Sequence, residues 1–211
     1  MYINFFCRTL LWLELVCLMG CDASRLRIKD FVQYVRNPEN GLVQRAESAG
    51  FRYELQYEPP ALAAFRQANQ AGQPDPDLYR QAFQDASQFY NFQLVVRNKS
   101  AEALDKLLEE QAGSKEAFSS WQNELFFKIQ NRFRLAVGPD TLPCTFYYTQ
   151  PMGKIENAYN ILLAFEAPVA RPVPGENRQL VVLYDDHLFS RQRLAFPFSL
   201  QQMHSLPELI F

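Results

Sequence analysis

Asp185-Asp186-His187 is the one place in the sequence where carboxylates adjoin an imidazole, a combination that could hold a metal ion or transfer a proton. The other of the two histidines, His204, stands alone near the C-terminus. Three adjacent residues at the end of a strand point in different directions, so they do not converge on one ion. We therefore predict a solvated turn here, with no metal and no cofactor.

Motifs for nucleophilic or phosphate chemistry are absent from the sequence: there is no Gly-x-Ser-x-Gly elbow, no His-Glu-x-x-His helix and no phosphate-binding glycine loop. Glycoside hydrolysis needs two carboxylates whose pairing in space a sequence does not reveal. The nominal candidates are Glu54, Glu58, Glu156 and Glu166. Acidic residues are common at exposed strand positions without any catalytic role, so we assign no catalytic residue.

Aromatic side chains suggest binding rather than catalysis. Phe146, Tyr147 and Tyr148 are consecutive in a segment predicted to be a strand, where neighbours face opposite sides. At least one of these rings could therefore lie outside the core, where it could stack on a sugar or anchor a protein. Tyr147 and Tyr148 are our candidate partner-binding residues. The alternative is that both faces of this strand are buried.

The N-terminal segment has the order of a bacterial export signal. Arg8 precedes an apolar run that ends in Leu18-Met19-Gly20-Cys21. Glu14 inside the run and the bulky Met19 depart from the usual pattern. A core helix of a cytosolic domain and an uncleaved anchor are the alternatives, although the run is too short to span a bilayer.

This segment resembles the lipobox of bacterial lipoproteins. The resemblance implies that residues 1–20 are a signal peptide and that Cys21 is acylated, with chains such as palmitate, as the first residue of the mature protein. It further implies attachment to a membrane of the cell envelope, which we expect to be the outer membrane. Asp22 would favour inner-membrane retention under enteric sorting rules, but these rules differ between bacteria.

A second resemblance lies toward the C-terminus. The segments Gly138-Pro139-Asp140-Thr141-Leu142-Pro143-Cys144, Phe146-Tyr147-Tyr148 and Ile161-Leu162-Leu163-Ala164-Phe165 are similar to a group of uncharacterised Gram-negative envelope lipoproteins. That group has no assigned activity, so the resemblance implies no catalytic residue.

Cysteine usage and charge limit the chemistry further. Of Cys7, Cys17, Cys21 and Cys144, cleavage and acylation would leave only Cys144 as a free thiol, without a disulfide partner. No Lys or Arg lies within five residues of Cys144 to lower its pKa, so we predict a buried, unreactive thiol. A net charge of −2 gives no basic field for nucleic acid.

Hydrophobic periodicity predicts an α+β fold. Helices are expected over residues 28–35, 61–70, 76 onward and 101–111, where apolar residues recur at helical spacing or strong helix formers are frequent. Asp75 and Ser100 are the expected caps of the last two. Strands are expected over 42–47, 51–57, 90–96, 125–137, 145–149, 159–166, 179–184 and 193–198. The first two would form a hairpin with its turn at Ser48-Ala49-Gly50. We predict an antiparallel β-sandwich or barrel-like sheet assembly with three or four packed helices. Residues 21–27 would be a tether and 28–211 a single globular domain.

These features predict a lipid-anchored envelope protein that acts as a binding or scaffolding module. Its partners would be the membrane, through the lipid on Cys21, and an envelope protein or glycan. An envelope hydrolase with dispersed carboxylates, or a soluble domain whose N-terminus has been misread, are the alternatives.

Overall fold

The computed structural model describes residues 25–69, 75–100, 104–150, 158–168 and 179–210. Its strands are β1 (Arg25–Arg27), β2 (Val43–Ser48), β3 (Phe51–Glu58), β4 (Phe89–Asn98), β5 (Phe133–Val137), β6 (Asp140–Pro143), β7 (Phe146–Gln150), β8 (Ala158–Glu166), β9 (Gln179–Asp185), β10 (Arg193–Ser199) and β11 (Glu208–Ile210). Its helices are α2 (Ile28–Arg36), α3 (Pro60–Ala68), α4 (Pro76–Ala86), α5 (Leu104–Ala112), α6 (Lys115–Phe127) and α7 (Leu200–His204), with short 3-10 turns at Pro38–Asn40 and Ile129–Arg132.

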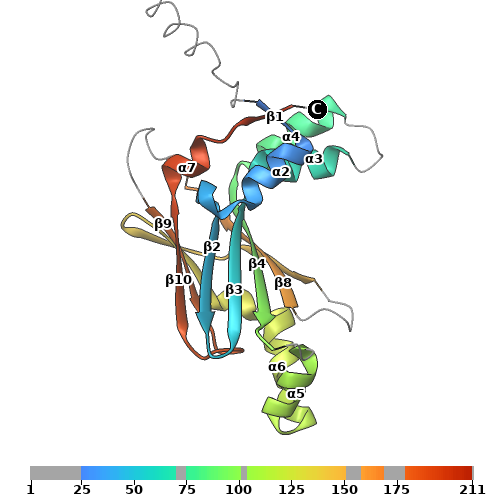
Figure 1. The fold of residues 1–211 in the computed structure, drawn as a ribbon, viewed down its shortest axis with the longest axis vertical. Coiled ribbons are helices and arrows are strands. Elements are labelled where there is room, and N and C mark those ends of the chain that lie inside the picture. Colours follow the sequence, from blue (N-terminus) through green and yellow to red (C-terminus); the bar gives the residue numbers. More distant parts are fainter. Residues whose placement is uncertain (1–24, 70–74, 101–103, 151–157, 169–178, 211) are drawn as a thin grey trace, which may run out of the picture.

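Two antiparallel sheets form the centre of the molecule, with helices at both ends (Figure 1). One sheet has the order β2-β3-β4-β8-β7 and the other β10-β9-β5-β6. Among the described strands no ladder joins the two sheets, so the barrel is not closed. The expected α+β assembly of antiparallel sheets and packed helices is confirmed, with six α-helices in the described ranges.

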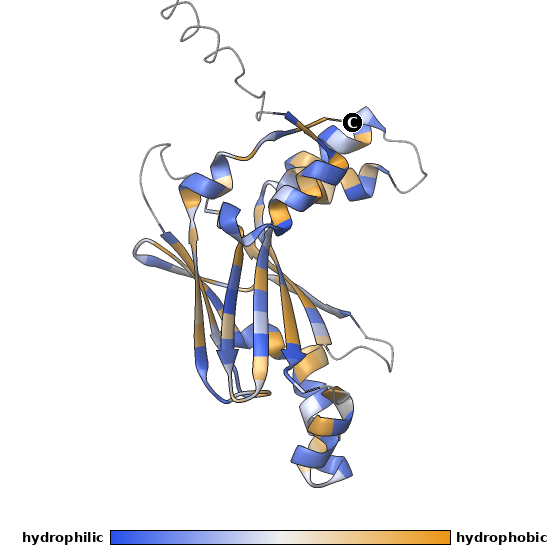
Figure 2. Ribbon diagram, viewed as in Figure 1, coloured by the Kyte–Doolittle hydropathy of each residue, from blue (hydrophilic) through white to orange (hydrophobic). Residues whose placement is uncertain are grey.

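Alternating side chains build the core between the sheets. Along β3, Phe51, Tyr53, Leu55 and Tyr57 are buried, and the residues between them face outward. Figure 2 shows this alternation as hydrophobic and hydrophilic bands along the strands. Rings meet across the gap between the sheets, with centroids 6.4 Å apart for Tyr53–Tyr184 and 5.1 Å apart for Phe92–Phe198. The sheets therefore pack as a sandwich whose inner layer combines aromatic rings with Leu, Val and Ile side chains.

Several local predictions are confirmed. The hairpin of β2 and β3 turns at Ala49 and Gly50, both with positive φ, as the favoured two-residue hairpin loops require. Helix α2 buries Phe31 and Val35 completely, and Asp75 caps α4 by accepting hydrogen bonds from two backbone N–H groups. Residues 101–103, at the start of the helix expected near α5, lie outside the described residues.

The long strand predicted over residues 125–137 is wrong in its first half. Ser114 instead caps α6, accepting a 3.1 Å hydrogen bond from the backbone N–H of Ala117, and the helix continues to Phe127. Leu125 and Ile129 are fully buried, whereas Phe127 is 70% exposed. A spacing of four residues fits both a helix face and a strand face, which is why the alternation was misleading.

Four short elements were not expected. After a loop in which Gly138 has a φ of +59°, β6 pairs back on β5, so the predicted turn continues as a strand. Helix α7 follows β10, and β11 pairs with β1 in parallel, from Arg25 opposite Glu208 to Arg27 opposite Ile210. Residues 25–27, predicted as the end of a tether, are thus held against a strand 183 residues away in sequence.

Candidate ligand-binding groove

Asp186, the middle residue of the Asp185-Asp186-His187 triplet, is buried and has a structural role. Its carboxylate accepts six hydrogen bonds: from the hydroxyls of Tyr53 (2.6 Å), Tyr184 (3.0 Å) and Ser190 (2.7 Å) and from the backbone N–H groups of residues 188–190. Tyr53 and Tyr184 belong to different sheets, so Asp186 joins the two layers. Burial, with the Asp186 carboxylate nearby, raises the pKa of both phenols.

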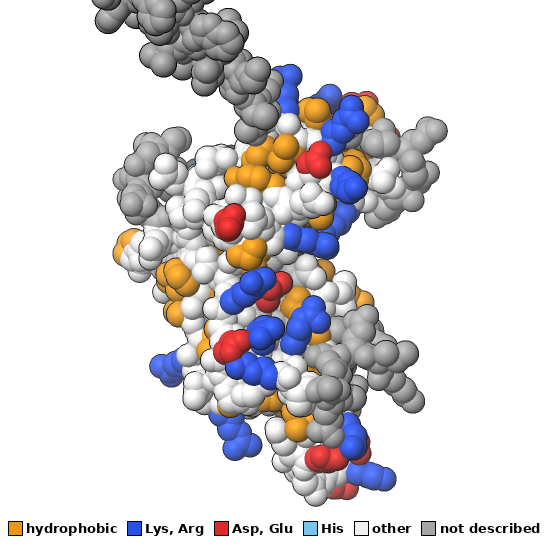
Figure 3. Space-filling model, viewed as in Figure 1, with side chains coloured by type: hydrophobic (Ala, Val, Ile, Leu, Met, Phe, Trp, Pro, Cys, Tyr) orange, Lys and Arg blue, Asp and Glu red, His pale blue; other side chains and the backbone are white. Residues whose placement is uncertain are grey.

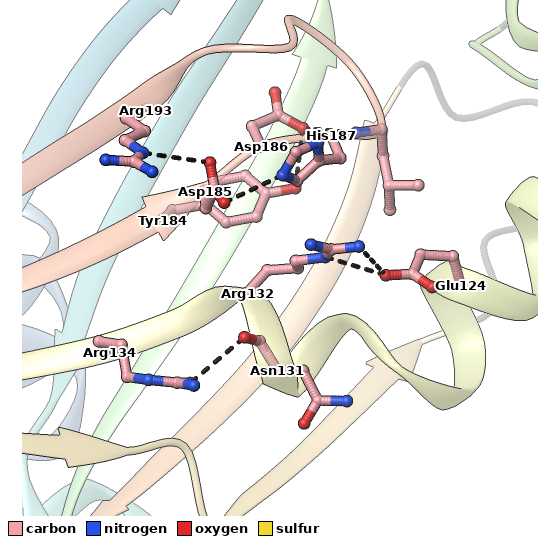
Figure 4. A network of polar contacts seen from close by, with 10 residues as sticks. Glu124, Asn131, Arg132, Arg134, Tyr184, Asp185, Asp186, His187 and Arg193 are labelled. Atoms are coloured by element: carbon pink, nitrogen blue, oxygen red, sulfur yellow. Dashed lines mark hydrogen bonds and ion pairs between the residues drawn. The ribbon is translucent and has the colours of Figure 1, made fainter.

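The other two residues of the triplet lie at the surface (Figure 4). Asp185 lies 2.9 Å from the His187 ring and 3.5 Å from the Arg193 guanidinium, and these contacts, led by that with His187, hold the pKa of Asp185 below its usual value. The predicted solvated turn therefore describes Asp185 and His187 but is wrong for Asp186. Within the described ranges, no group of three or more His, Cys, Asp or Glu residues could hold a metal ion.

Of the carboxylates considered for hydrolysis, two are held in ion pairs. Glu54 is ion-paired with Arg45 at 2.8 Å, and Glu58 is ion-paired with Arg66. Together with the ion pairs of Glu47, these contacts give β2 and β3 an outer face rich in balanced charges, visible in the middle of Figure 3. Glu166 is exposed at the end of β8, and Glu156 lies outside the described residues.

Cys144 lies beneath β7 and is buried, as predicted. Its Sγ lies 3.2 Å from the carbonyl oxygen of Phe146 and 3.6 Å from that of Ala164, so the single S–H has two possible acceptors, and the residue is 8% exposed. Burial raises the pKa of the thiol to about 11. The side chain therefore supports the β7–β8 pair and is poorly suited to act as a nucleophile at neutral pH.

The three aromatic residues of β7 divide between two faces, as the alternation predicts. Phe146 and Tyr148 point outward and are 61% and 57% exposed. Tyr147 points the other way, is partly buried, and donates a 2.8 Å hydrogen bond to the carbonyl of Phe126 at the end of α6. Of the two tyrosines proposed to bind a partner, Tyr148 is thus available at the surface, and the hydroxyl of Tyr147 is used within the fold.

A groove of about 410 Å³ lies between this outer face and the helices α3 and α4. One side is aromatic, formed by Phe146, Tyr148 and Phe89, whose ring meets that of Phe146 edge-on at 5.8 Å. The opposite side carries Ala63 and Ala82, whose short side chains leave the space open. In Figure 3 the outline of the molecule narrows just below these helices.

Polar groups line and border the same groove. The ion-paired Glu58 lies at its helical side, and Asn91 in its floor donates to the carbonyl of Ala86 at 3.4 Å. Next to the groove, the amides of Gln93, Asn160 and Gln150 form a hydrogen-bonded row across three strands. The groove thus combines flat apolar rings with neutral donors and acceptors.

Sequence reasoning missed Phe146 and Phe89 as part of this site. The i, i+2 spacing of Phe146 and Tyr148 was a usable signal, because it places both rings on one face of a strand. The contribution of Phe89 depends on the pairing of β4 with β8 and of β8 with β7, which is a long-range property of the sheet.

Comparisons with known proteins give no functional lead. No family model and no curated protein matches this sequence. The fold search found a crystal structure of a novel protein of unknown function from Burkholderia pseudomallei K96243, with 10% identity and a TM-score of 0.35 over 87% of this chain and 95% of that chain. A likeness at that level supports no inference.

Proposed function

We propose that the protein is a lipid-anchored envelope module that binds a neutral glycan in the β7 groove. The observation that carries the proposal is the pair Phe146 and Tyr148, both more than half exposed on one face of a strand at the end of its sheet. Large rings are costly to leave in water, and exposed rings beside a groove are typical anchors for a ligand.

The chemistry of the groove favours a sugar chain over an anionic ligand. Successive outward residues on a strand are separated by about 7 Å, so the rings of Phe146 and Tyr148 present two neighbouring flat surfaces to the apolar faces of a glycan. The amides of Gln93, Asn160 and Gln150 can donate to and accept from hydroxyl groups. Glu58 and Asp85 line the groove, and the nearby Arg66 is already paired with Glu58, so an anionic glycan would be disfavoured.

The acidic residues of the groove favour binding of a glycan over its hydrolysis. Glu58 and Asp85 are the two acids that line the groove in the described part of the chain, and Glu58 is held by Arg66. The Glu58 carboxylate is already occupied by this ion pair, which it would have to leave in order to act on a substrate. Turnover of a bound oligosaccharide would move the protein to the hydrolase class.

The lipid anchor is the second part of the proposal. Its support is the apolar run ending in Gly20-Cys21, and two or more acyl chains on Cys21 would give stable attachment to the envelope, on the outer membrane by our expectation. None of the helices in the described ranges is long and apolar enough to cross a bilayer. The intact mass of detergent-extracted protein tests the anchor: a chain that keeps Met1 contradicts it.

Calorimetric titration with an N-acetylglucosamine pentamer and with cellopentaose tests the groove. We expect Tyr148→Ala and Phe146→Ala each to weaken binding at least about tenfold. Phe127→Ala is the matched control, because this ring is 70% exposed on α6 and does not line the groove. Equal affinities in all variants, or no binding of either sugar to the wild type, would overturn the glycan proposal. Crosslinked recovery of a protein partner that depends on Tyr148 would assign the groove to protein binding instead.

A further inference from the structure

A second cavity, of about 730 Å³, lies at the helical end of the sandwich. Its walls come from α2, α3, α4, α7 and the segment that leads into β11, and most of the lining is apolar, including Phe31, Phe83, Met203 and Leu209. Phe83 is 40% exposed, so an apolar ring is accessible at the surface next to the cavity. The volume lies in the range of cavities that enclose small ligands.

Tyr57 supplies a polar contact inside this apolar space. It lines the cavity at the end of β3 and is only 5% exposed, with its ring 5.7 Å from that of Phe92. Its hydroxyl makes no hydrogen bond to any residue that the structure describes. Burial raises the pKa of this phenol, so the group stays neutral and can donate one hydrogen bond. The Tyr57 oxygen is not among the fully buried atoms, so it opens onto the cavity, and its hydrogen bond is available to a ligand oxygen.

The cavity lies at the end of the molecule where the N-terminal segment enters. Strand β1, which lies beside the C-terminus in Figure 1, pairs with β11. Leu209 of β11 lines the cavity. Cys21 is four residues before Arg25, so an extended chain places it within about 14 Å of β1. If Cys21 carries the anchor, as proposed above, this end faces the membrane, where acyl chains are abundant.

We propose that this cavity binds an aliphatic acyl chain, with the carbonyl oxygen of the chain accepting a hydrogen bond from Tyr57. The apolar walls suit the hydrocarbon, and the polar lining of Gln84, Ser87, His204 and Glu208 offers no Lys or Arg to fix a phosphate. The recognised group is therefore the chain with its ester carbonyl rather than an anionic headgroup. The chain comes either from a membrane lipid or from the acyl group on Cys21.

Fluorescence titration of the detergent-extracted full-length protein with cis-parinaric acid, displaced by methyl palmitate, tests this site. Ala61→Trp and Leu206→Trp each place a large ring in the cavity from a different segment of the chain, and we expect each to reduce binding at least about tenfold. Tyr57→Phe keeps the ring and removes the donor, so methyl palmitate should displace the probe about two- to tenfold less well. Phe127→Ala, whose exposed ring lines neither this cavity nor the groove, should bind the probe as the wild type does.

The outcomes separate this proposal from the anchor and from the groove. The tryptophan variants are compared with the wild type only where they keep its thermal unfolding midpoint. If such a variant binds the probe as well as the wild type does, the cavity proposal is overturned. It is also overturned if neither the wild type nor Cys21→Ser binds the probe. Stronger probe binding by Cys21→Ser than by the wild type supports the cavity and identifies the protein's own acyl group as the occupant. Unchanged binding supports a membrane lipid. An unacylated Cys21 by mass would refute the anchor and leave the titration as a test of the cavity.

Discussion

The turn at Asp186 and the groove beside β7 differ in how far their side chains are already used within the fold. The carboxylate of Asp186 is 1% exposed and accepts six hydrogen bonds. Its two oxygens offer about four lone-pair directions, so no capacity is left for a ligand. Phe146 and Tyr148 instead hold large ring surfaces in water beside an open groove. The comparison teaches that unused interaction capacity, rather than residue type, is what distinguishes the proposed binding groove from the structural Asp186.

Loss of the Asp186 carboxylate should have the largest effect. Asp186→Ala leaves the Tyr53 and Tyr184 hydroxyls and backbone N–H groups buried without an acceptor, so we expect the free energy of unfolding to fall by at least about 3 kcal/mol. Urea denaturation measures this. Asp185→Ala, in the exposed neighbour, is the control and should change stability little. Similar losses in the two variants would contradict the structural role of Asp186.

The buried Cys144 thiol, just before β7, should make the free energy of unfolding depend on pH. Cys144 has its pKa raised from 9.0 to about 11, so the unfolded chain loses this proton first as pH rises. The contribution of the neutral thiol to the free energy of unfolding is complete below pH 9. It is lost between pH 9 and 11, at up to about 1.4 kcal/mol per pH unit. Denaturation at pH 8, 9 and 10 should show a shallower decline for Cys144→Ala than for the wild type. The tyrosines, including Tyr53 and Tyr184, contribute mainly above pH 10 and are common to both proteins.

The smallest expected effect distinguishes the two neighbouring tyrosines of β7. Tyr147→Phe removes the hydrogen bond to the Phe126 carbonyl and should lower the free energy of unfolding by about 1 kcal/mol, without changing sugar affinity. Tyr148→Phe should leave stability unchanged, because the ring lies at the surface. A Tyr147→Phe variant with normal stability and weakened sugar binding would return Tyr147 to the binding site.

Local signals predicted much of the fold. The apolar spacing in α2, the Asp75 cap of α4 and the alternation along β3 each depend on residues close in sequence, and each matches the structure. The segment from Leu125 failed because a four-residue spacing satisfies both helix and strand, and the Ser114 cap was the signal that should have decided between them.

The sites were less predictable because they depend on long-range pairing. The alternation in β7 correctly placed Tyr147 and Tyr148 on opposite faces but did not say which face was buried. Asp186 was taken for a solvated residue because its acceptor role needs Tyr53, 133 residues away in sequence. Neither the groove between β7 and α4 nor the cavity beside β11 has a local signature.

The pairing of β1 with β11 has a consequence for the order of assembly. Arg25 and Glu208 are joined by an ion pair across 183 residues, so β1 has no partner until almost the whole described chain has been made. Contacts between such distant residues form late, after the loop-closure entropy has been overcome by the packing of what lies between them. The sandwich can therefore form first, and the end where β1 pairs with β11, beside the second cavity, closes last.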